Sequence, residues 1–389
     1  MDYLKVGIIG IGNMGSAHLH CISEGNIKGL TAVSVCDINK ATLAAAKEKY
    51  PNIKAFENYE DLLADNEVDT VIIAVPHILH ADIAIKAFMA GKHVLLEKPV
   101  DITVTKATAL NRAAKISGKQ FGIVFNQRTN MLYAKAREII KSGKLGEIKR
   151  SVWIVTNWYR TQHYYDSGSW RATWLGEGGG VLLNQAPHNL DLWQWICGMP
   201  KTVTAICNVA KYHDIEVEDE AAIYTTYENG ATGVFLTSTG EYPGTNRLEI
   251  SGTKGKIVIE GQTLKLWSLK LDERDVCYNS NENFASIEKE YIEIKGERET
   301  AHRGILQNFA NSVLLGEELL APGYDGINEL TISNAAYLSS WNNNKTISIP
   351  FDYAEFDRAL RARQSYSKLK NQTNNKLSDE YSSRWQVHW

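Results

Sequence analysis

Two side chains in this sequence have the chemistry to move a proton to or from an alcohol: Lys98 and His188. Lys98 ends the stretch GKHVLLEK and is followed by Pro99, which keeps the preceding residue extended. His188 lies within GGGVLLNQAPHNLD (178–191). An imidazole can accept a hydroxyl proton near neutral pH, and a lysine can orient and polarise the same hydroxyl. We predict that His188 is the base and Lys98 its partner, with the reverse assignment left open.

Two polar residues accompany His188. Asn184 precedes it by four positions and Asp191 follows it by three. In a helix over 183–196, Asn184 and His188 share one face, with Asp191 nearby. We expect both to contact substrate, although an amide cannot stabilise an imidazolium as a carboxylate would. Apolar neighbours such as Leu190 keep a purely structural core histidine as the alternative.

A glycine-rich turn follows the first apolar run of the chain. It reads G-x-G-x-x-G over 10–15, at the point where a strand gives way to a helix. Glycines there allow a tight turn and let the backbone approach a pyrophosphate at the helix N-terminus. The residues predicted to line this cofactor site are Gly10, Ile11, Gly12, Asn13, Met14 and Gly15.

The preferred cofactor is indicated by Asp37, at the end of the second apolar run. A carboxylate in this place accepts hydrogen bonds from ribose hydroxyls and repels a 2′-phosphate. We therefore predict NAD rather than NADP, although the nearby Lys40 could balance a phosphate. Residues at the ends of later strands are expected near the nicotinamide, because ligands bind at the carboxyl ends of parallel strands. They are Pro76, His77, His80, Glu97 and Lys98.

The segment over 157–177 is unusually rich in aromatic residues, interleaved with charged ones. Rings that stack on sugar C–H faces, beside charges that bind hydroxyls, are typical of carbohydrate sites. From this segment we predict substrate contacts by Trp158, Arg160 and Trp174. A surface loop that packs in a dimer is the alternative explanation.

The pattern of apolar residues predicts two kinds of domain around these groups. Up to about residue 125, wholly apolar runs alternate with helical ones, which is typical of a Rossmann-type, doubly wound α/β fold with a parallel sheet. Beyond it, apolar and polar residues alternate along strands, and Asn229-Gly230 marks a hairpin. We predict an α+β domain with a mainly antiparallel open sheet over 126–350, after a domain over 1–125, and a polar extension over 351–389.

Composition limits the classes of partner. A net charge of −3 without a basic stripe gives no reason to expect nucleic acid, and no apolar run approaches the roughly 20 residues of a membrane helix. Five scattered cysteines favour a reducing, cytoplasmic location. The His, Cys and acidic spacings show no metal motif. The open sheet face makes a homo-oligomer, dimer or tetramer, plausible.

Taken together, G-x-G-x-x-G, AGKHVLLEKP (90–99) and GGGVLLNQAPHNLD resemble the glucose–fructose oxidoreductase/inositol dehydrogenase (Gfo/Idh/MocA) family. The resemblance implies NAD(P)-dependent chemistry at a hydroxyl-bearing carbon of a sugar, glycoside or cyclitol. It implies cofactor contacts by Trp170 and Arg171 and a cleft residue at His302. Asn184 departs from the family, which has an acid there. Redox-assisted glycoside hydrolysis and a non-catalytic NAD- or sugar-sensing regulator are the two alternatives.

Overall fold

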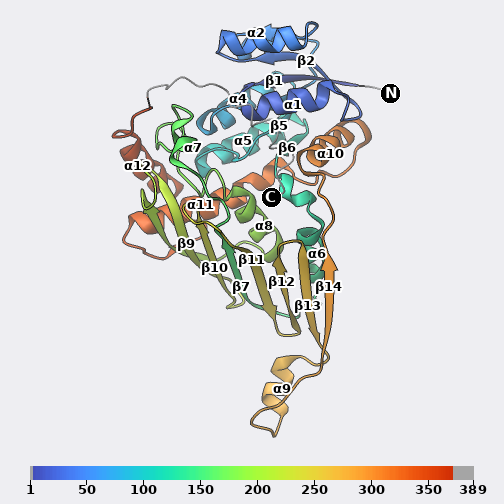
Figure 1. Ribbon diagram of the computed structural model, residues 1–389, viewed down its shortest axis with the longest axis vertical. Coiled ribbons are helices and arrows are strands. Elements are labelled where there is room, and N and C mark those ends of the chain that lie inside the picture. The colour runs from blue at the N-terminus through green and yellow to red at the C-terminus, as the bar shows by residue number, and fades with distance from the viewer. Residues whose placement is uncertain (1–2, 371–389) are drawn as a thin grey trace.

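Two sheets organise the chain, with helices between them (Figure 1). The computed structural model describes residues 3–370 of the 389. The smaller sheet, near the N-terminus, lies at the top of the view, and the larger one lies below it. None of the helices in the described part of the chain is long and apolar enough to span a membrane.

The first sheet has six parallel strands in the order β3-β2-β1-β4-β5-β6. Its strands are β1 (Leu4–Ile9), β2 (Leu30–Cys36), β3 (Lys54–Phe56), β4 (Thr70–Ile73), β5 (His93–Leu96) and β6 (Phe121–Ile123). The order reverses between β1 and β4, and in such sheets the carboxyl ends at this point form the ligand site. The predicted Rossmann-type fold is confirmed.

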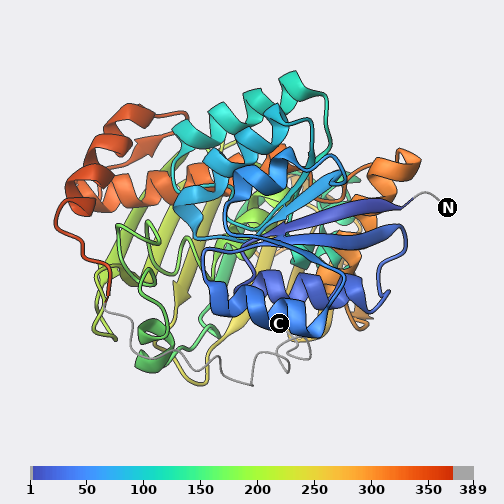
Figure 2. The same cartoon turned by 90° about the horizontal axis from the view of Figure 1, so that it is seen from above.

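Helices cover both faces of this sheet, as the view from above shows (Figure 2). They are α1 (Asn13–Ser23), α2 (Lys40–Lys49), α3 (Tyr59–Ala64), α4 (His80–Met89) and α5 (Val104–Ser117), with the short 3₁₀ turn η1 (His77–Leu79). Because both faces are covered, adjacent strand residues such as Val71, Ile72 and Ile73 are all buried. This double burial explains why the strands read as continuous apolar runs.

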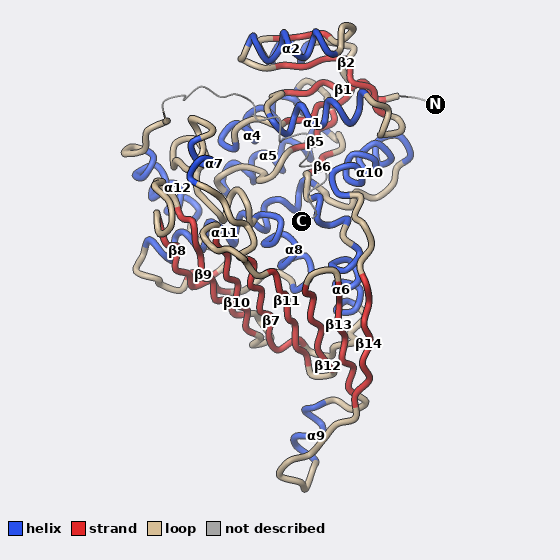
Figure 3. The backbone as a smooth tube through the Cα atoms, viewed as in Figure 1, coloured by secondary structure: helices blue, strands red, loops and turns tan. Residues whose placement is uncertain are grey.

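The second sheet has nine strands, drawn in red in the lower half of Figure 3. Their order is β14-β13-β12-β11-β7-β10-β9-β8-β15, and all neighbours are antiparallel except β7 and β10. The strands are β7 (Ile148–Val155), β8 (Thr202–Val209), β9 (Glu218–Thr226), β10 (Thr232–Ser238), β11 (Asn246–Gly252), β12 (Gly255–Glu260), β13 (Thr263–Leu269), β14 (Lys289–Lys295) and β15 (Ile347–Ser348). The predicted mainly antiparallel sheet is confirmed, and Gly230 takes the left-handed φ of 81° that its hairpin requires.

The remaining helices follow β6 in the chain. They are η2 (Asn126–Thr129), α6 (Met131–Lys141), α7 (Gln162–Asp166), α8 (Pro187–Cys197), α9 (Glu273–Asn279), α10 (Ala301–Leu315), η3 (Gly323–Asp325), α11 (Gly326–Trp341) and α12 (Tyr353–Gln364). α11 contacts α5 of the first domain as well as α8 and β8 of the second, so it ties the two together.

Two expectations about this half need correction. The helix expected over 183–196 begins only at Pro187, so Asn184 lies in the turn before α8 and does not share a helical face with His188. The segment after residue 350 is not simply a polar extension, because α12 packs on the second domain. Phe356 stacks on Trp341 with centroids 5.5 Å apart, and the Arg363 guanidinium lies 3.7 Å from the same ring. Residues 371–389, with Trp385 and Trp389, lie outside the described residues.

Candidate active site

The glycine turn between β1 and α1 has the form of a phosphate cradle. Gly10 has a φ of 83°, and a Cβ there would lie 2.6 Å from the carbonyl oxygen of Ala74. A Cβ on Gly15 would lie 1.8 Å from the carbonyl oxygen of Gly10, whereas one on Gly12 would meet open space. Gly12 caps α1 without a side-chain hydrogen bond, so no side chain of the cap covers the N–H groups there. These features fit a bound pyrophosphate at the helix N-terminus.

Asp37 lies against the same turn. Its Oδ2 accepts a hydrogen bond of 2.9 Å from the Ile11 backbone N–H, and its Oδ1 accepts one of 2.9 Å from that of Asn39. The carboxylate is therefore fixed beside the turn, where the ribose of a dinucleotide is expected. Lys40, the cation that might have balanced a 2′-phosphate, lies 3.1 Å from the Glu57 carboxylate. The local charges thus favour NAD.

Lys98 joins the two halves of the site. It follows β5, and its Nζ donates a hydrogen bond of 2.7 Å to the backbone carbonyl of Asn184, in the turn before α8. Burial lowers the pKa of Lys98, and Arg171 adds to this, while the Glu97 and Glu177 carboxylates oppose it. A lysine with a lowered pKa exchanges a proton more readily than an exposed one.

His188 lies near Lys98, Glu97 and His302, whose charges affect its pKa. Burial lowers its pKa well below the ordinary value, and the charge of Lys98 lowers it further. The imidazole is therefore neutral at pH 7, and its Nδ1 has no hydrogen-bond partner among the described residues. That nitrogen is buried, but the side chain as a whole is partly exposed, and a neutral imidazole can accept a hydrogen bond from a ligand hydroxyl through a nitrogen that the ligand reaches.

Glu97 and His18 form a buried acid–imidazole pair near Lys98 and His188. The Nε2 of His18, from α1, is 2.7 Å from the Glu97 carboxylate, and the His18 ring lies 6.1 Å from the ring of His302. Although burial opposes the charged form, His18 lowers the pKa of Glu97 to about 2. Burial lowers the pKa of His302 to about 4. Glu97, predicted as a cofactor contact, is thus held by His18, which sequence reasoning did not single out.

A second carboxylate, Glu177, lies beside Asn184, the residue that stands where the family has an acid. The side-chain amide of Asn184 donates to it, and the Ala172 backbone N–H donates to its other oxygen over 2.6 Å. Glu177 is buried, and burial raises its pKa. It was not predicted. The only signal in the sequence is its position immediately before the three glycines. A carboxylate that is buried there needs a partner, because carboxylates are seldom buried without one.

Trp170 and Arg171, which the family resemblance predicts as cofactor contacts, lie between His77 of the first domain and Tyr164 of the second. The Trp170 ring is 5.4 Å from that of His77, which follows β4 and whose Nδ1 is 3.3 Å from the carbonyl oxygen of Glu177. The Arg171 guanidinium lies 4.7 Å from the Trp170 ring and donates a 3.0 Å hydrogen bond to Tyr164 Oη. These contacts link Trp170 to both His77 and Arg171, and each of these two side chains lies near Lys98.

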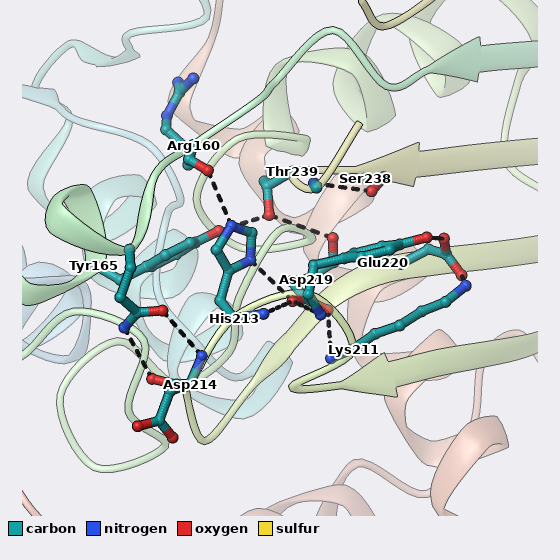
Figure 4. A network of polar contacts seen from close by, with 12 residues as sticks. Arg160, Tyr165, Lys211, His213, Asp214, Asp219, Glu220, Ser238 and Thr239 are labelled. Carbon is teal, nitrogen blue, oxygen red and sulfur yellow. Dashed lines mark hydrogen bonds and ion pairs between the residues drawn. The ribbon is translucent and has the colours of Figure 1, made fainter. Parts of the chain in front are cut away.

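The segment that carries Arg160 is held by a polar network (Figure 4). His213 lies between two acceptors: Nδ1 is 2.9 Å from Asp219 and Nε2 is 2.9 Å from the Arg160 carbonyl. Asp219 also accepts three backbone hydrogen bonds, from Lys211, Tyr212 and His213. Arg160 is thus anchored through its backbone, and its guanidinium lies 5.8 Å from the ring of Trp158.

The Trp158 indole donates a hydrogen bond of 3.2 Å to the side chain of Asn189, the residue next to His188. Trp158 and Arg160 both remain candidates for substrate contact.

Three predicted ligand contacts are corrected by their surroundings. Both oxygens of Asp191 bind the guanidinium of Arg128, at 2.8 and 2.6 Å, and the pair is fully buried. Trp174 packs edge-on against Tyr337 and Trp341, 5.7 and 5.5 Å away. Both ring nitrogens of His80 lie against backbone carbonyls, those of Pro99 and Val75. These side chains support the fold around the site rather than facing a ligand. Within residues 3–370, no group of three or more metal-binding side chains is assembled.

Comparison with known proteins identifies the family. Residues 4–125 match the model described as "Oxidoreductase family, NAD-binding Rossmann fold", and residues 133–258 match the "GFO/IDH/MocA C-terminal domain". The chain belongs to the Gfo/Idh/MocA family, with an NAD-binding Rossmann domain at its N-terminus.

The proteins that the chain resembles include three dehydrogenases. An inositol 2-dehydrogenase of Salmonella paratyphi B is 37% identical over 146 residues, which are 37% of this chain and 43% of that protein. The chain therefore matches less than half the length of that relative. A myo-inositol 2-dehydrogenase of Thermotoga maritima is 24% identical over 86% of this chain and 95% of its own length. The WlbA dehydrogenase of Bordetella pertussis, solved with NADH and UDP-GlcNAcA, has a TM-score of 0.77 at 25% identity and covers 90% and 99% of the two chains.

Proposed function

We propose that the protein is an NAD-dependent dehydrogenase that transfers a hydride between the nicotinamide and a hydroxyl-bearing carbon of a sugar, glycoside or cyclitol. The observation that carries the proposal is the meeting of Lys98, from the first domain, with Asn184, in the turn that leads to His188. Inositol and nucleotide-sugar substrates in the names of relatives support a polyhydroxylated substrate.

The chain's own residues divide the work in the following way. The glycine turn and Asp37 bind NAD, which supplies the hydride acceptor at its nicotinamide ring. Lys98 orients the substrate hydroxyl and draws electron density from its oxygen. His188, neutral at pH 7, accepts a hydrogen bond from that hydroxyl. Trp158, Arg160 and His302 are proposed to contact the remaining hydroxyl groups.

We further propose that the protein works in a reducing compartment, the cytoplasm, as a homo-oligomer. All five cysteines are free. The second sheet also exposes apolar side chains such as Ile206 and Tyr224, which self-association would cover.

The test is a panel of hexoses, glycosides and inositols, in which NADH formation and aglycone release are both measured. NADH that accumulates with one sugar class supports the dehydrogenase. Aglycone release without net NADH would establish redox-assisted hydrolysis instead, and tight NAD binding with no turnover would indicate a regulator. His188→Ala should abolish turnover while NAD affinity stays near wild type, and weak NAD binding in that variant would mark His188 as structural.

A further inference from the structure

Tyr164, in α7, has an unusual environment for a tyrosine. Three nitrogen donors point at its Oη: Nη1 of Arg171 at 3.0 Å, Nδ2 of Asn184 at 3.3 Å and Nε2 of Gln185 at 3.3 Å. A phenol oxygen has its own proton to place, and three donors around it leave that proton no acceptor. A phenolate oxygen, in contrast, accepts several hydrogen bonds well, and those from charged donors are the strongest.

Positive charge also faces the ring of Tyr164. The guanidinium carbon of Arg171 lies 4.8 Å from the ring centroid, and that of Arg160 lies 5.1 Å from it. Burial and the Glu177 carboxylate oppose ionisation of the phenol. Arg171, Arg160 and Lys98 outweigh them and lower the pKa of Tyr164 below its ordinary value of about 10. The network of His213 and Asp219 holds the Arg160 segment in this place.

Tyr164 is also next to the groups that handle substrate. Its oxygen touches the side chain of Asn184, whose backbone carbonyl binds Lys98. Tyr164 affects the pKa of Lys98, and Lys98 affects that of His188, so both candidate proton acceptors lie near this lysine. The low pKa of His188 means that this ring, once protonated, would not retain the proton.

We propose that Tyr164 is a further catalytic residue, whose phenolate oxygen carries away the proton of the substrate hydroxyl. This rests on the dehydrogenase function proposed above. In the oxidation, the substrate O–H bond breaks and a phenol O–H bond forms at Tyr164, while the C–H bond breaks and its electron pair passes with the hydrogen to NAD. A ketone, NADH and neutral Tyr164 result. The ring is partly exposed, so its proton can return to water.

The first test needs no substrate. The near-ultraviolet band of phenolate is followed during a pH titration of the whole protein and of Tyr164→Phe. Among the 18 tyrosines, the wild type should show one that ionises before the others, and Tyr164→Phe should lack it. The matched control is Tyr165→Phe. The hydroxyl of Tyr165 binds Thr239 at 2.7 Å, and burial raises its pKa, so this variant should keep the early phase.

The second test uses a sugar that is oxidised in the panel. Tyr164→Phe should lower kcat by about 100-fold or more, with NAD affinity unchanged, because general acid–base groups contribute about that much. Tyr165→Phe should stay near wild type. If Tyr164→Phe does not fold, Arg171→Gln replaces it in the titration and should move the early phase to higher pH.

Either of two results would overturn the proposal. One is a titration in which wild type and Tyr164→Phe differ only in the late phase, as expected if Gln185 were turned over and its oxygen accepted the Tyr164 proton. The other is a kcat and pH profile of Tyr164→Phe equal to those of Tyr165→Phe. A panel without any sugar oxidation would defeat the dehydrogenase function, whereas the titration would still report on Tyr164 by itself.

Discussion

The ammonium group of Lys98 donates a 2.7 Å hydrogen bond to the backbone carbonyl of Asn184 across 86 positions of sequence. This bond joins the end of β5 to the turn before α8, so Lys98 links the first domain to the second. Lys98 is half-buried there, with the Glu97 and Glu177 carboxylates close enough to affect its pKa. The relationship makes Lys98 the first residue to test.

Replacing Lys98 with Met should lower kcat by about 100-fold or more, because the hydroxyl loses its orienting and polarising partner. NAD affinity, measured by fluorescence titration, should change little, since the glycine turn and Asp37 remain. Lys106→Met is the matched control: that lysine pairs with Asp82 on the surface. Equal activity of the two variants would remove Lys98 from the reaction.

Changing Asn184 to Asp should alter the pH dependence of activity. The new carboxylate would face Glu177, to which the Asn184 amide now donates, and two adjacent carboxylates cannot both ionise easily. One of them should stay protonated near neutral pH, which adds an inflection to the profile. The double variant with Glu177→Gln should remove that inflection. Superimposable profiles for wild type and Asn184→Asp would place both residues outside the proton path.

Asp191→Asn should reduce stability rather than substrate affinity. The change removes the carboxylate charge and one of the two acceptor oxygens from the buried guanidinium of Arg128. Only the Asp325 carboxylate then balances its charge, at a cost of about 3 kcal/mol in the free energy of unfolding. Asp325→Asn is the control, because Asp325 is partly exposed and should cost about 1 kcal/mol. Urea denaturation measures both. A raised KM at unchanged stability would restore the role first predicted for Asp191.

These residues show which parts of the candidate site can be predicted from the sequence. The glycine turn, Asp37 and the Lys98-Pro99 strand end were predictable, because each depends on a local pattern attached to one strand. Arg128 and Asp191 are 63 positions apart, and no local pattern links them. Tyr164 and Glu177 were missed for the same reason: only the fold brings them to Lys98.

The fold divides in a similar way. The change from wholly apolar runs to alternating apolar and polar residues correctly predicted the change from a parallel to a mainly antiparallel sheet. The start of α8 was placed too early because the apolar run before Pro187 looks helical, although those residues form turns. Because the sequence of α12 is mostly polar, its packing on the rest of the protein was not predicted. Only Phe356 and Leu360 of that helix are fully buried, too few for a clear period.

Acidification should destabilise the protein through His302. Its pKa is about 6.5 in the unfolded chain and about 4 in the folded one, so the unfolded state binds the proton first as pH falls. The contribution is fully present above pH 6.5 and is lost as pH falls towards about 4. His302→Asn should therefore show a shallower loss of stability over this window in urea denaturation, and His20→Asn, on the exposed side of α1, should follow wild type. A slope in His302→Asn as steep as in wild type would contradict the lowered pKa of the imidazole.

Asp37→Ser should change the choice of cofactor. The wild-type carboxylate is expected to accept hydrogen bonds from the ribose hydroxyls and to repel a 2′-phosphate. Its removal should therefore weaken NAD binding and strengthen NADP binding, and change the ratio of the two affinities by about 10-fold or more. Glu57→Gln tests the same idea without touching the turn. It releases Lys40 from its ion pair, and the freed cation should improve NADP binding while NAD binding stays constant. Both affinities are measured by titration at one ionic strength, because the phosphate contribution is screened by salt. An unchanged ratio in Asp37→Ser, with the glycine turn intact by its melting temperature, would mean that Asp37 serves only to hold Ile11.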